Sequence, residues 1–359
     1  MVEWKKLGEV CEVLDSQRKP VSKGKRSQGE YPYYGANGIQ DYVDGYIFDG
    51  TYLLLGEDGS VINNDNSPVL RWATGKIWVN NHAHILQENN KALLRYLYYT
   101  LQCTDVSDIV RGMPPKINQA NMRNILIPIP SLEEQTRIVG ILDTFTSAID
   151  NLKEQIAQRR KQYEYYRDQL LDLEGKEGME RVLLKDVCEV INGRAYSQPE
   201  LLNEGKYRVL RVGNFFSNDS WYYSDLELES KYYCQKGDLL YAWSASFGPH
   251  IWEEEKVIYH YHIWKMDCSN GLHKKFMYYW LQSEDMKRQA FTNLHGATMA
   301  HLTKALMEAL MVPLPPLQEQ QRIVSILDTF EASIQNLEAQ LKERQKQYEY
   351  YRNKLLSFE

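Results

Sequence analysis

The chain has 359 residues, of which 43% are hydrophobic and 25% charged, and its 42 basic and 48 acidic side chains leave a net charge of −6. This length predicts two domains, the composition excludes a disordered chain, and an acidic total does not by itself indicate nucleic-acid binding. No apolar run reaches the ~20 residues that span a bilayer, and the first residues lack a signal-peptide core. Five cysteines without a C-x-x-C pair argue against a disulfide or zinc scaffold, so we expect a cytoplasmic protein without a membrane partner.

The first part of the chain predicts a mostly β domain of the α+β class. An apolar strand pattern at residues 7–14 is followed by alternating Tyr, Ile and Val segments with Gly and Asn between them, and then by a helical pattern at 91–102. The same succession returns at residues 183–191 and 273–282. Many short strands with few helices are typical of this fold class.

A turn-rich stretch near the start carries a cluster of basic side chains. Such clusters can bind phosphates, although a solvated surface without a ligand is an equally ordinary explanation. The cluster consists of Arg18, Lys19, Lys23, Lys25 and Arg26.

Two polar loops share a position but differ in chemistry. Strand 52–55 leads into residues 56–60 (GEDGS), and strand 238–241 leads into residues 242–248 (AWSASFG). Divergent loops on matching scaffolds usually carry binding specificity.

The chain is an internal duplication. Residues 127–174 and 312–359 are identical at 28 of 48 positions without a gap, at an offset of 185. Earlier segments repeat more faintly, for example the His-x-His pairs at residues 82–84 and 260–262. The chain is therefore one unit of about 180 residues present twice, each a variable domain followed by a shared tail. We expect the boundaries at residues 1–130, 131–174, 175–315 and 316–359.

Each tail predicts a helix of about 40 residues with a heptad seam. Ser131 and Glu134 form a capping box at the start of the first tail, whereas Pro316 replaces the serine in the second. The seam can pair with the other copy, either only as a spacer or dimer handle or as a scaffold whose repeated surface suits two identical partners. Its members are Ile138, Leu142, Phe145, Ile149, Leu152, Ile156, Tyr163, Tyr166 and Leu170 in the first tail, and Ile323, Leu327, Phe330, Ile334, Leu337, Leu341, Tyr348, Tyr351 and Leu355 in the second.

Motifs for catalysis are missing from the sequence. It contains neither the glycine-rich loop and Asn-Pro-Pro-Tyr-like motif of an adenine methyltransferase nor a G-x-x-x-x-G-K-[ST] phosphate loop. His82 and His84, like His260 and His262, place both rings of a pair on one face of a strand. No third ligand recurs at a matching place in both units, so we expect no metal and a structural or DNA-facing pair. The chain is predicted to be non-catalytic.

The layout closely resembles the specificity subunit of type I restriction–modification systems. The resemblance rests on KLGEV at residues 6–10, YPYYGANGI at 31–39, GDLLYAWS at 237–244, and a repeated P-x-P-x-L-x-E-Q-x-x-I at 128–138 and 313–323. It spans essentially the whole chain.

The resemblance implies two target recognition domains, each reading one half of a bipartite double-stranded DNA site. It also implies an antiparallel coiled coil of the two helices that fixes the separation of the domains. Two methyltransferase subunits would dock on this scaffold and carry S-adenosylmethionine, while restriction subunits would carry ATP and Mg²⁺. This chain would hold no cofactor itself. Because the two domains differ in sequence, we expect an asymmetric site.

Candidate DNA contacts follow from this interpretation, beyond the basic cluster. An adaptor that joins two proteins without DNA and a self-sufficient DNA-modifying enzyme are the alternatives. The candidates are Tyr34, Asn37, Ser60, Asn81 and Lys116 in the first domain, and Arg194, Asn214, Trp243, Ser244 and Thr298 in the second.

Overall fold

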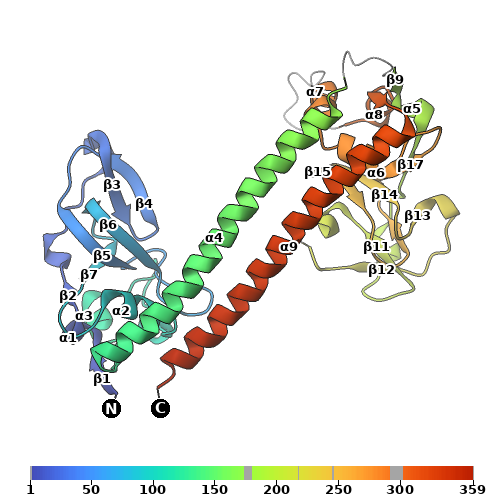
Figure 1. The fold of residues 1–359 in the computed structure, drawn as a ribbon. Helices are drawn as coiled ribbons and strands as arrows, with labels where there is room; N and C mark the ends of the chain where they lie inside the picture. Colours follow the sequence, from blue (N-terminus) through green and yellow to red (C-terminus); the bar gives the residue numbers. More distant parts are fainter. Residues whose placement is uncertain (1, 174–179, 217, 245, 292–301, 359) are drawn as a thin grey trace. The chain divides into compact units, whose positions relative to one another are not determined.

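The computed structural model describes residues 2–173, 180–216, 218–244, 246–291 and 302–358 (Figure 1). The chain divides into two compact units: unit 1 combines Met1–Lys153 with Ala339–Glu359, and unit 2 is Glu154–Glu338. Each unit contains one mixed α/β domain and part of each of two long helices.

Unit 1 is built on a six-stranded sheet with the strand order β2-β7-β5-β6-β3-β4. Among the described residues, its strands pair antiparallel except β3 with β6, which run parallel. Strands β1 and β8 form a separate antiparallel pair. The elements are β1 (Glu3–Lys6), α1 (Leu7–Val10), β2 (Glu12–Val13), β3 (Gln28–Gly35), β4 (Gly38–Val43), β5 (Phe48–Gly56), β6 (Leu70–Val79), β7 (Ala83–Gln87), α2 (Leu94–Leu101), α3 (Gln119–Arg123) and β8 (Leu126–Ile129).

Unit 2 carries two four-stranded sheets, ordered β10-β17-β14-β15 and β12-β11-β16-β13, and a β18-β9 pair. In the described part of unit 2, strands β11 and β16 pair in parallel. The elements are β9 (Glu180–Leu183), α5 (Leu184–Val187), β10 (Cys188–Asn192), β11 (Tyr207–Leu210), β12 (Tyr222–Ser224), β13 (Tyr233–Cys234), β14 (Leu239–Ser244), β15 (Ser246–Ile251), β16 (Val257–Tyr259), β17 (Ile263–Cys268), α6 (Lys274–Trp280), α7 (Glu284–Phe291), α8 (Lys304–Glu308) and β18 (Met311–Leu314).

Two local expectations are corrected. The apolar pattern that opens each unit is a helical turn before a short strand, because Leu7 and Val10, and likewise Leu184 and Val187, are buried three residues apart on one side of the turn. Residues 242–248 form no simple loop after a strand, since β14 continues to Ser244 and pairs with β15 as a hairpin.

The two tails are the predicted long helices, α4 (Leu132–Leu171) and α9 (Leu317–Leu356), each of 40 residues. The N–H of Glu134 donates to the Ser131 hydroxyl at 3.3 Å, which is one of the two bonds of a capping box, and the Glu134 carboxylate accepts from Arg137. In the second copy the Pro316 carbonyl accepts from the N–H of Glu319 at 2.8 Å.

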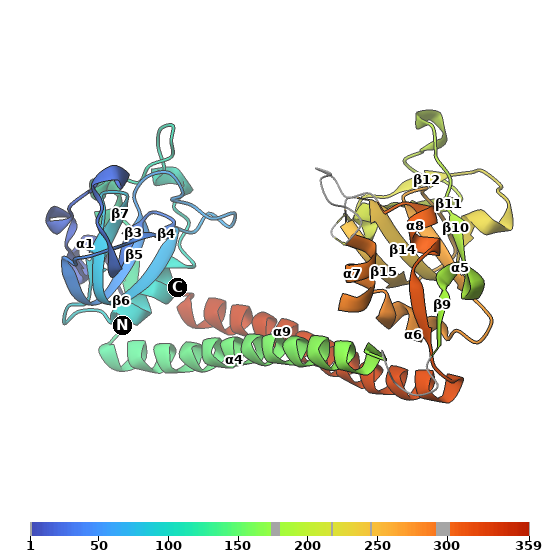
Figure 2. The ribbon, with the colours of Figure 1, turned by 90° about the horizontal axis from the view of Figure 1, so that it is seen from above.

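Within each unit the segments of α4 and α9 pair side by side and antiparallel (Figures 1 and 2). In unit 1 Phe145 stacks on Tyr351, and in unit 2 Tyr166 stacks on Phe330. The two seam tyrosines of these stacks are exposed, Tyr166 at 47% and Tyr351 at 41%. The other seam residues are buried or half-buried.

Each domain is fixed to its own helix segments by repeated contacts. Arg95 and Tyr99 of α2 bond the Asp143 carboxylate at 2.7 and 2.5 Å. Lys275 and Tyr279 of α6 bond Asp328 at 2.6 Å each. In Figure 2, α6 lies between the strands of unit 2 and α9. Equivalent anchors in both copies indicate that the duplication preserved the domain–helix junction as well as the helices.

Candidate nucleic-acid interface

In the described part of the chain, each unit has one pair of parallel strands, β3 with β6 in unit 1 and β11 with β16 in unit 2. We term the edge at which the carboxyl ends of these two strands lie the carboxyl edge. In unit 1 the N–H of Asn80, just after β6, donates to the Tyr34 carbonyl of β3 at 3.0 Å. In unit 2 the N–H of His260, just after β16, donates to the Leu210 carbonyl of β11 at 2.9 Å. The segments that leave these strands hold the duplicated His-x-His pairs. Both units therefore have an equivalent carboxyl edge that carries a His-x-His pair.

The β3–β4 hairpin brings two sequence-predicted candidates to this edge in unit 1. Asn37 is exposed at the hairpin tip and Tyr34 is half-buried in β3. Gly38 adopts a φ of 102°, which favours glycine, and a Cβ there would lie 3.4 Å from Nε of Arg71. Arg71 is exposed and, among the described residues, forms no ion pair, so its guanidinium is available to a ligand beside Asn37.

The remaining unit 1 candidates gather around the loop after β5. The N–H of Glu57 donates to the His82 carbonyl at 2.9 Å, and its carboxylate lies 3.1 Å from Nζ of Lys116. Asn81 precedes His82 and is exposed, as is Ser60 in the loop itself. Three loops that are distant in the sequence thus present Ser60, Asn81 and Lys116 around Glu57.

A buried charge network lies behind this surface. The Nδ1 atom of fully buried His84 lies 2.6 Å from the Asp15 carboxylate, and Nη1 of Arg18 lies 2.5 Å from that of Glu57. Arg18 also donates to the Ala83 carbonyl at 2.9 Å. Arg18, predicted to contact phosphate, therefore serves mainly to hold the loops together.

The electrostatics of the network favour ionised carboxylates. Burial alone would raise the pKa of Asp15, but hydrogen bonding and charge from His84, with help from Arg18, lower it. Burial would also raise the pKa of Glu57, but Arg18, His84 and Lys116 lower it. The ligand atoms of Asp15, Glu57 and His84 lie within 4.8 Å of one another, as in a metal site. Since Arg18 and Lys116 already neutralise the carboxylates, we assign a charge network here.

The basic cluster divides into two kinds of side chain. Arg26 is internal, because it donates to the Val21 carbonyl at 3.0 Å and to Asp41 at 3.2 Å, and lies 4.1 Å over the Tyr33 ring. Exposed ammonium groups remain for phosphates. They belong to Lys19, Lys23 and Lys25.

In unit 2, backbone bonds draw several candidates to the carboxyl edge. The N–H of Arg194 donates to the Tyr259 carbonyl at 3.1 Å, and its own carbonyl accepts from Tyr261 at 3.0 Å. The N–H of Trp243 donates to the His262 carbonyl at 3.2 Å, and Nε1 of Trp243 donates to the Tyr261 carbonyl at 2.9 Å. Arg194 and Trp243 are therefore neighbours of the second His-x-His pair.

The other unit 2 candidates are placed differently. Ser244 is half-buried at the end of β14, beside Trp243. The Asn214 amide donates to the carbonyls of Asn218 and Ser220 at 2.9 and 3.0 Å, so it holds a turn together. Thr298 lies outside the described residues.

Sequence reasoning missed two arginines at the carboxyl edges. Arg71 is the second residue of β6 and lies beside Gly38 of the β3–β4 hairpin, whereas Arg211 follows β11 directly. Neither belongs to a motif. The pairing of strands that are distant in the sequence brings both to the edge, and a single sequence gives no signal for that pairing.

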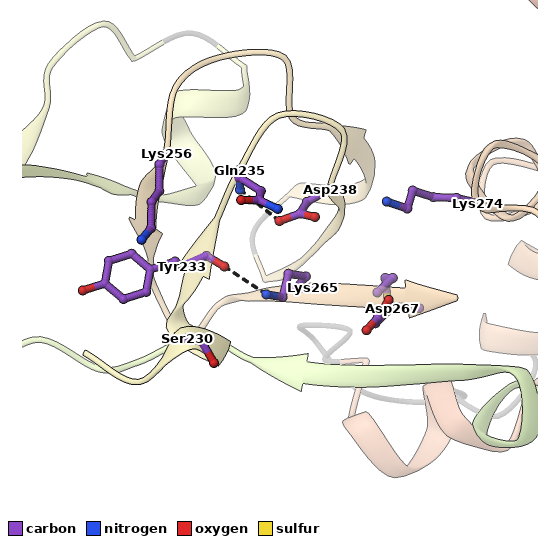
Figure 3. A pocket seen from close by; sticks show the side chains of 9 residues that line it. Ser230, Tyr233, Gln235, Asp238, Lys256, Lys265, Asp267 and Lys274 are labelled. Carbon is purple, nitrogen blue, oxygen red and sulfur yellow. Dashed lines mark hydrogen bonds between the residues drawn. The ribbon is translucent and has the colours of Figure 1, made fainter. Parts of the chain in front are cut away.

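A polar pocket of unit 2 lies at the opposite end of β14 (Figure 3). Its volume is about 400 Å³, and it is lined by three lysines and two aspartates, among others. Lys265 and Lys274 each donate to a backbone carbonyl at 2.9 Å, and Lys256 lies 3.9 Å over a tyrosine ring. With Asp238 and Asp267 nearby, these ammonium groups are already engaged, so we place no ligand there.

Two exposed apolar positions of the long helices repeat almost unchanged in both copies. Tyr165 and Tyr350 occupy the same position of the two helices and are 61% and 60% exposed. Leu132 and Leu317, at the two helix starts, are 48% and 49% exposed. Equal exposure of large apolar side chains at duplicated positions is typical of a surface that binds the same partner twice. We term these four residues the duplicated apolar face.

Comparisons with known proteins agree along the whole chain. Two stretches, residues 1–159 and 176–346, match the family model described as type I restriction modification DNA specificity domain. The putative type I restriction enzyme specificity subunit S.HindORF215P of Haemophilus influenzae is 34% identical over 378 residues, covering 99% of this chain and 96% of the relative. The EcoR124I/EcoR124II specificity subunit of Escherichia coli is 26% identical, covering 99% and 94%.

Solved structures show the same fold. The type I restriction–modification S subunit from M. genitalium superposes with a TM-score of 0.65 at 16% identity, covering 100% of this chain and 97% of that chain. A chain from a structure on complex assembly and conformational transition of the type I R-M system gives 0.59 at 19% identity, covering 99% and 96%. None of the helices within the described ranges is long and apolar enough to cross a membrane. The chain belongs to the family of type I restriction–modification DNA specificity subunits.

Proposed function

We propose that this chain reads an asymmetric bipartite site in double-stranded DNA, one half through each carboxyl edge. The observation that carries the proposal is that the same edge of the same strand pair presents polar and cationic side chains in both units, with different residues in each. Exposed lysines supply contacts to the DNA backbone, and Asn37, Asn81 and Trp243 approach base edges. Different side chains at equivalent places give two different half-sites.

The chain also assembles the catalytic subunits. Two methyltransferase subunits bind its duplicated apolar face, one per copy, and restriction subunits join that complex. The equal exposure of Tyr165 and Tyr350 supports this stoichiometry. The protein–protein adaptor without DNA is not favoured, because both relatives described above are named as specificity subunits.

The chemistry resides on the partners. Methyltransferase subunits carry S-adenosylmethionine, restriction subunits carry ATP and Mg²⁺, and this chain is non-catalytic and acts where cytoplasmic DNA is modified. The sequence supports this assignment because it lacks both the methyltransferase motif and the phosphate loop. Purified chain mixed with labelled S-adenosylmethionine and genomic DNA is expected to transfer no methyl groups until methyltransferase subunits are added.

The DNA-reading role is tested by changing one edge. In cells that carry the methyltransferase complex, the double substitution Ser60→Ala with Asn81→Ala is expected to relax one half of the methylated sequence, each lost base contact being worth about 1–3 kcal/mol. The other half stays unchanged. Thr74→Ala, at an exposed position in the middle of β6, is the matched control. Methylome sequencing gives the result, and relaxation of both halves together would contradict the assignment.

The assembly role is tested on the helices. Tyr165→Ala and Tyr350→Ala are each expected to remove one methyltransferase subunit from the complex, and the double variant both. Tyr42→Ala removes another exposed tyrosine, from β4, and is expected to leave assembly intact. Native mass spectrometry counts the subunits. Full assembly by the double variant would overturn the docking surface.

A further inference from the structure

Three polar side-chain atoms at the carboxyl edge of unit 2 are buried without a hydrogen-bond partner. They are Nη1 of Arg194, Nε of Arg211 and the hydroxyl of Tyr196. Buried polar groups are nearly always hydrogen-bonded, so each orphan indicates a missing water or ligand. Three of them near one edge point to a binding site whose ligand is absent.

The three side chains meet around His260. The Arg194 guanidinium lies 5.1 Å over the Tyr196 ring, and that ring stacks on His260 with centroids 6.4 Å apart. Arg211 directly follows Leu210, whose carbonyl accepts the His260 N–H at 2.9 Å. Segments that are far apart in the sequence therefore converge here, which makes the site a product of the fold.

The site carries excess positive charge. Nη2 of Arg194 is paired with Glu200 at 2.6 Å. Arg211 lies 4.2 Å over the Tyr222 ring, and within the described part of the chain it has no carboxylate partner. Burial, followed by the charges of His262 and Arg211, lowers the pKa of His260 to about 4. The imidazole is therefore neutral near pH 7, and the uncompensated charge is that of Arg211, because the charge of Arg194 is balanced by Glu200.

We propose that Arg211, Arg194 and Tyr196 form a cradle for one backbone phosphate of the DNA bound at the second half-site. Guanidinium N–H groups are donors only and the tyrosine hydroxyl can donate, whereas phosphate oxygens are acceptors only. Stacking on Tyr222 and Tyr196 fixes both guanidinium planes before the ligand arrives. The inference rests on the proposed function for the source of the phosphate, because the donor set itself fits any phosphate or sulfate group.

The DNA arm of the test uses the full chain assembled with its methyltransferase subunits. Arg211→Gln is expected to weaken binding to a specific duplex about tenfold and to reduce the slope of log affinity against log salt by about 0.9. The matched control is Arg208→Gln in β11, the strand that Arg211 follows. Arg208 is already paired with Glu254 at 2.8 Å, so this substitution is expected to leave the slope unchanged. Equal slope changes in both variants, or altered base preference with an unchanged slope, would overturn the phosphate assignment.

The ion arm uses the full chain without DNA, so it remains decisive if the proposed function fails. Sulfate and inorganic phosphate are expected to raise the melting temperature of the wild-type chain more than chloride does at equal ionic strength. Tyr196→Phe deletes only the orphan hydroxyl, so it folds without loss of stability in chloride but loses part of the sulfate effect. No excess sulfate effect in the wild type, or an undiminished one in Tyr196→Phe, rejects the cradle.

Discussion

The ring of Phe145 stacks on the ring of Tyr351 in unit 1, with centroids 5.3 Å apart and planes inclined by 26°. Unit 2 repeats this contact between Phe330 and Tyr166, at 5.5 Å and 27°. The partners are related by the duplication, since Phe145 corresponds to Phe330 and Tyr166 to Tyr351. Each unit thus closes its helix pair with the same two residues contributed in the opposite order.

This symmetry predicts that the two aromatic stacks contribute equally to the stability of their units. Phe145→Ala and Phe330→Ala are each expected to destabilise their own unit by about 2 kcal/mol, of which about 1 kcal/mol is coupling to the partner tyrosine. Hydrogen exchange of amides in each unit, with a double-mutant cycle that includes Tyr351→Ala, measures both quantities. A coupling energy near zero would mean that the stacks fill space without holding the helices together.

The buried network of unit 1 predicts acid sensitivity. The pKa values of Asp15 and Glu57 are lowered in the folded state, so the stability they contribute is present above pH 4.5 and is lost as the pH falls through their lowered folded values. Asp15→Asn is expected to destabilise unit 1 by about 3 kcal/mol at neutral pH and to flatten its acid unfolding. Denaturant unfolding as a function of pH gives both effects. Asp41→Asn, which breaks the more exposed contact with Arg26, is the control and has a smaller effect.

His260 predicts a separate acid response for unit 2. Because its folded pKa is lowered to about 4, the stability tied to the neutral imidazole is present above pH 6.5 and declines as the pH falls toward 4. His260→Gln is expected to remove this decline from unit 2 while unit 1 keeps its own. Amide exchange resolved by unit distinguishes the two. An unchanged pH profile in the variant would show that another group titrates.

The recognition domains are expected to be exchangeable one at a time. Replacing residues 1–126 with the matching domain of a relative keeps every residue of α4 and α9, including the Asp143 anchor. Only one half of the methylated sequence should then change. Methylome sequencing decides the matter, and a change in both halves would mean that the domains do not read independently.

Insertion of a heptad tests whether the helices set the spacer. Seven residues added after Gln155 and after Gln340 preserve the seam and lengthen each helix by about 10 Å, or about three stacked base pairs. We expect both half-sequences to survive with a spacer longer by about two to three base pairs and with weaker activity, because the DNA also turns by roughly 100°. An unchanged spacer in an active variant would show that the helices do not set the distance between the two half-sites.

The matched control is a three-residue insertion at the same two places. It lengthens the helices less, but it rotates the seam out of register. Less of the assembled complex is therefore expected than for the heptad variant. Native mass spectrometry of the two complexes provides the comparison.

The long helices and the duplication could be predicted because periodicity and repeats are local properties of the sequence. Roles of single side chains could not. Arg18 and Arg26 look like phosphate-binding residues in a basic run, yet both are used by internal partners that lie far along the chain. Arg71 and Arg211 look ordinary, and only the pairing of strands that are distant in the sequence brings them to an edge. The helical turns at Leu7 and Leu184 were missed because a short run of buried residues has no clear period.

The division of the chain gives its synthesis a fixed order. Unit 2 is a continuous stretch, whereas unit 1 needs residues 339–359 in addition to its first 153. Leu356 packs in one core with Ile138 and Leu142, and this core stays open until the last of these residues leaves the ribosome. The domain that is translated first is therefore the last to be completed. A premature stop codon at residue 339 would leave unit 2 with all its residues and unit 1 without its last segment.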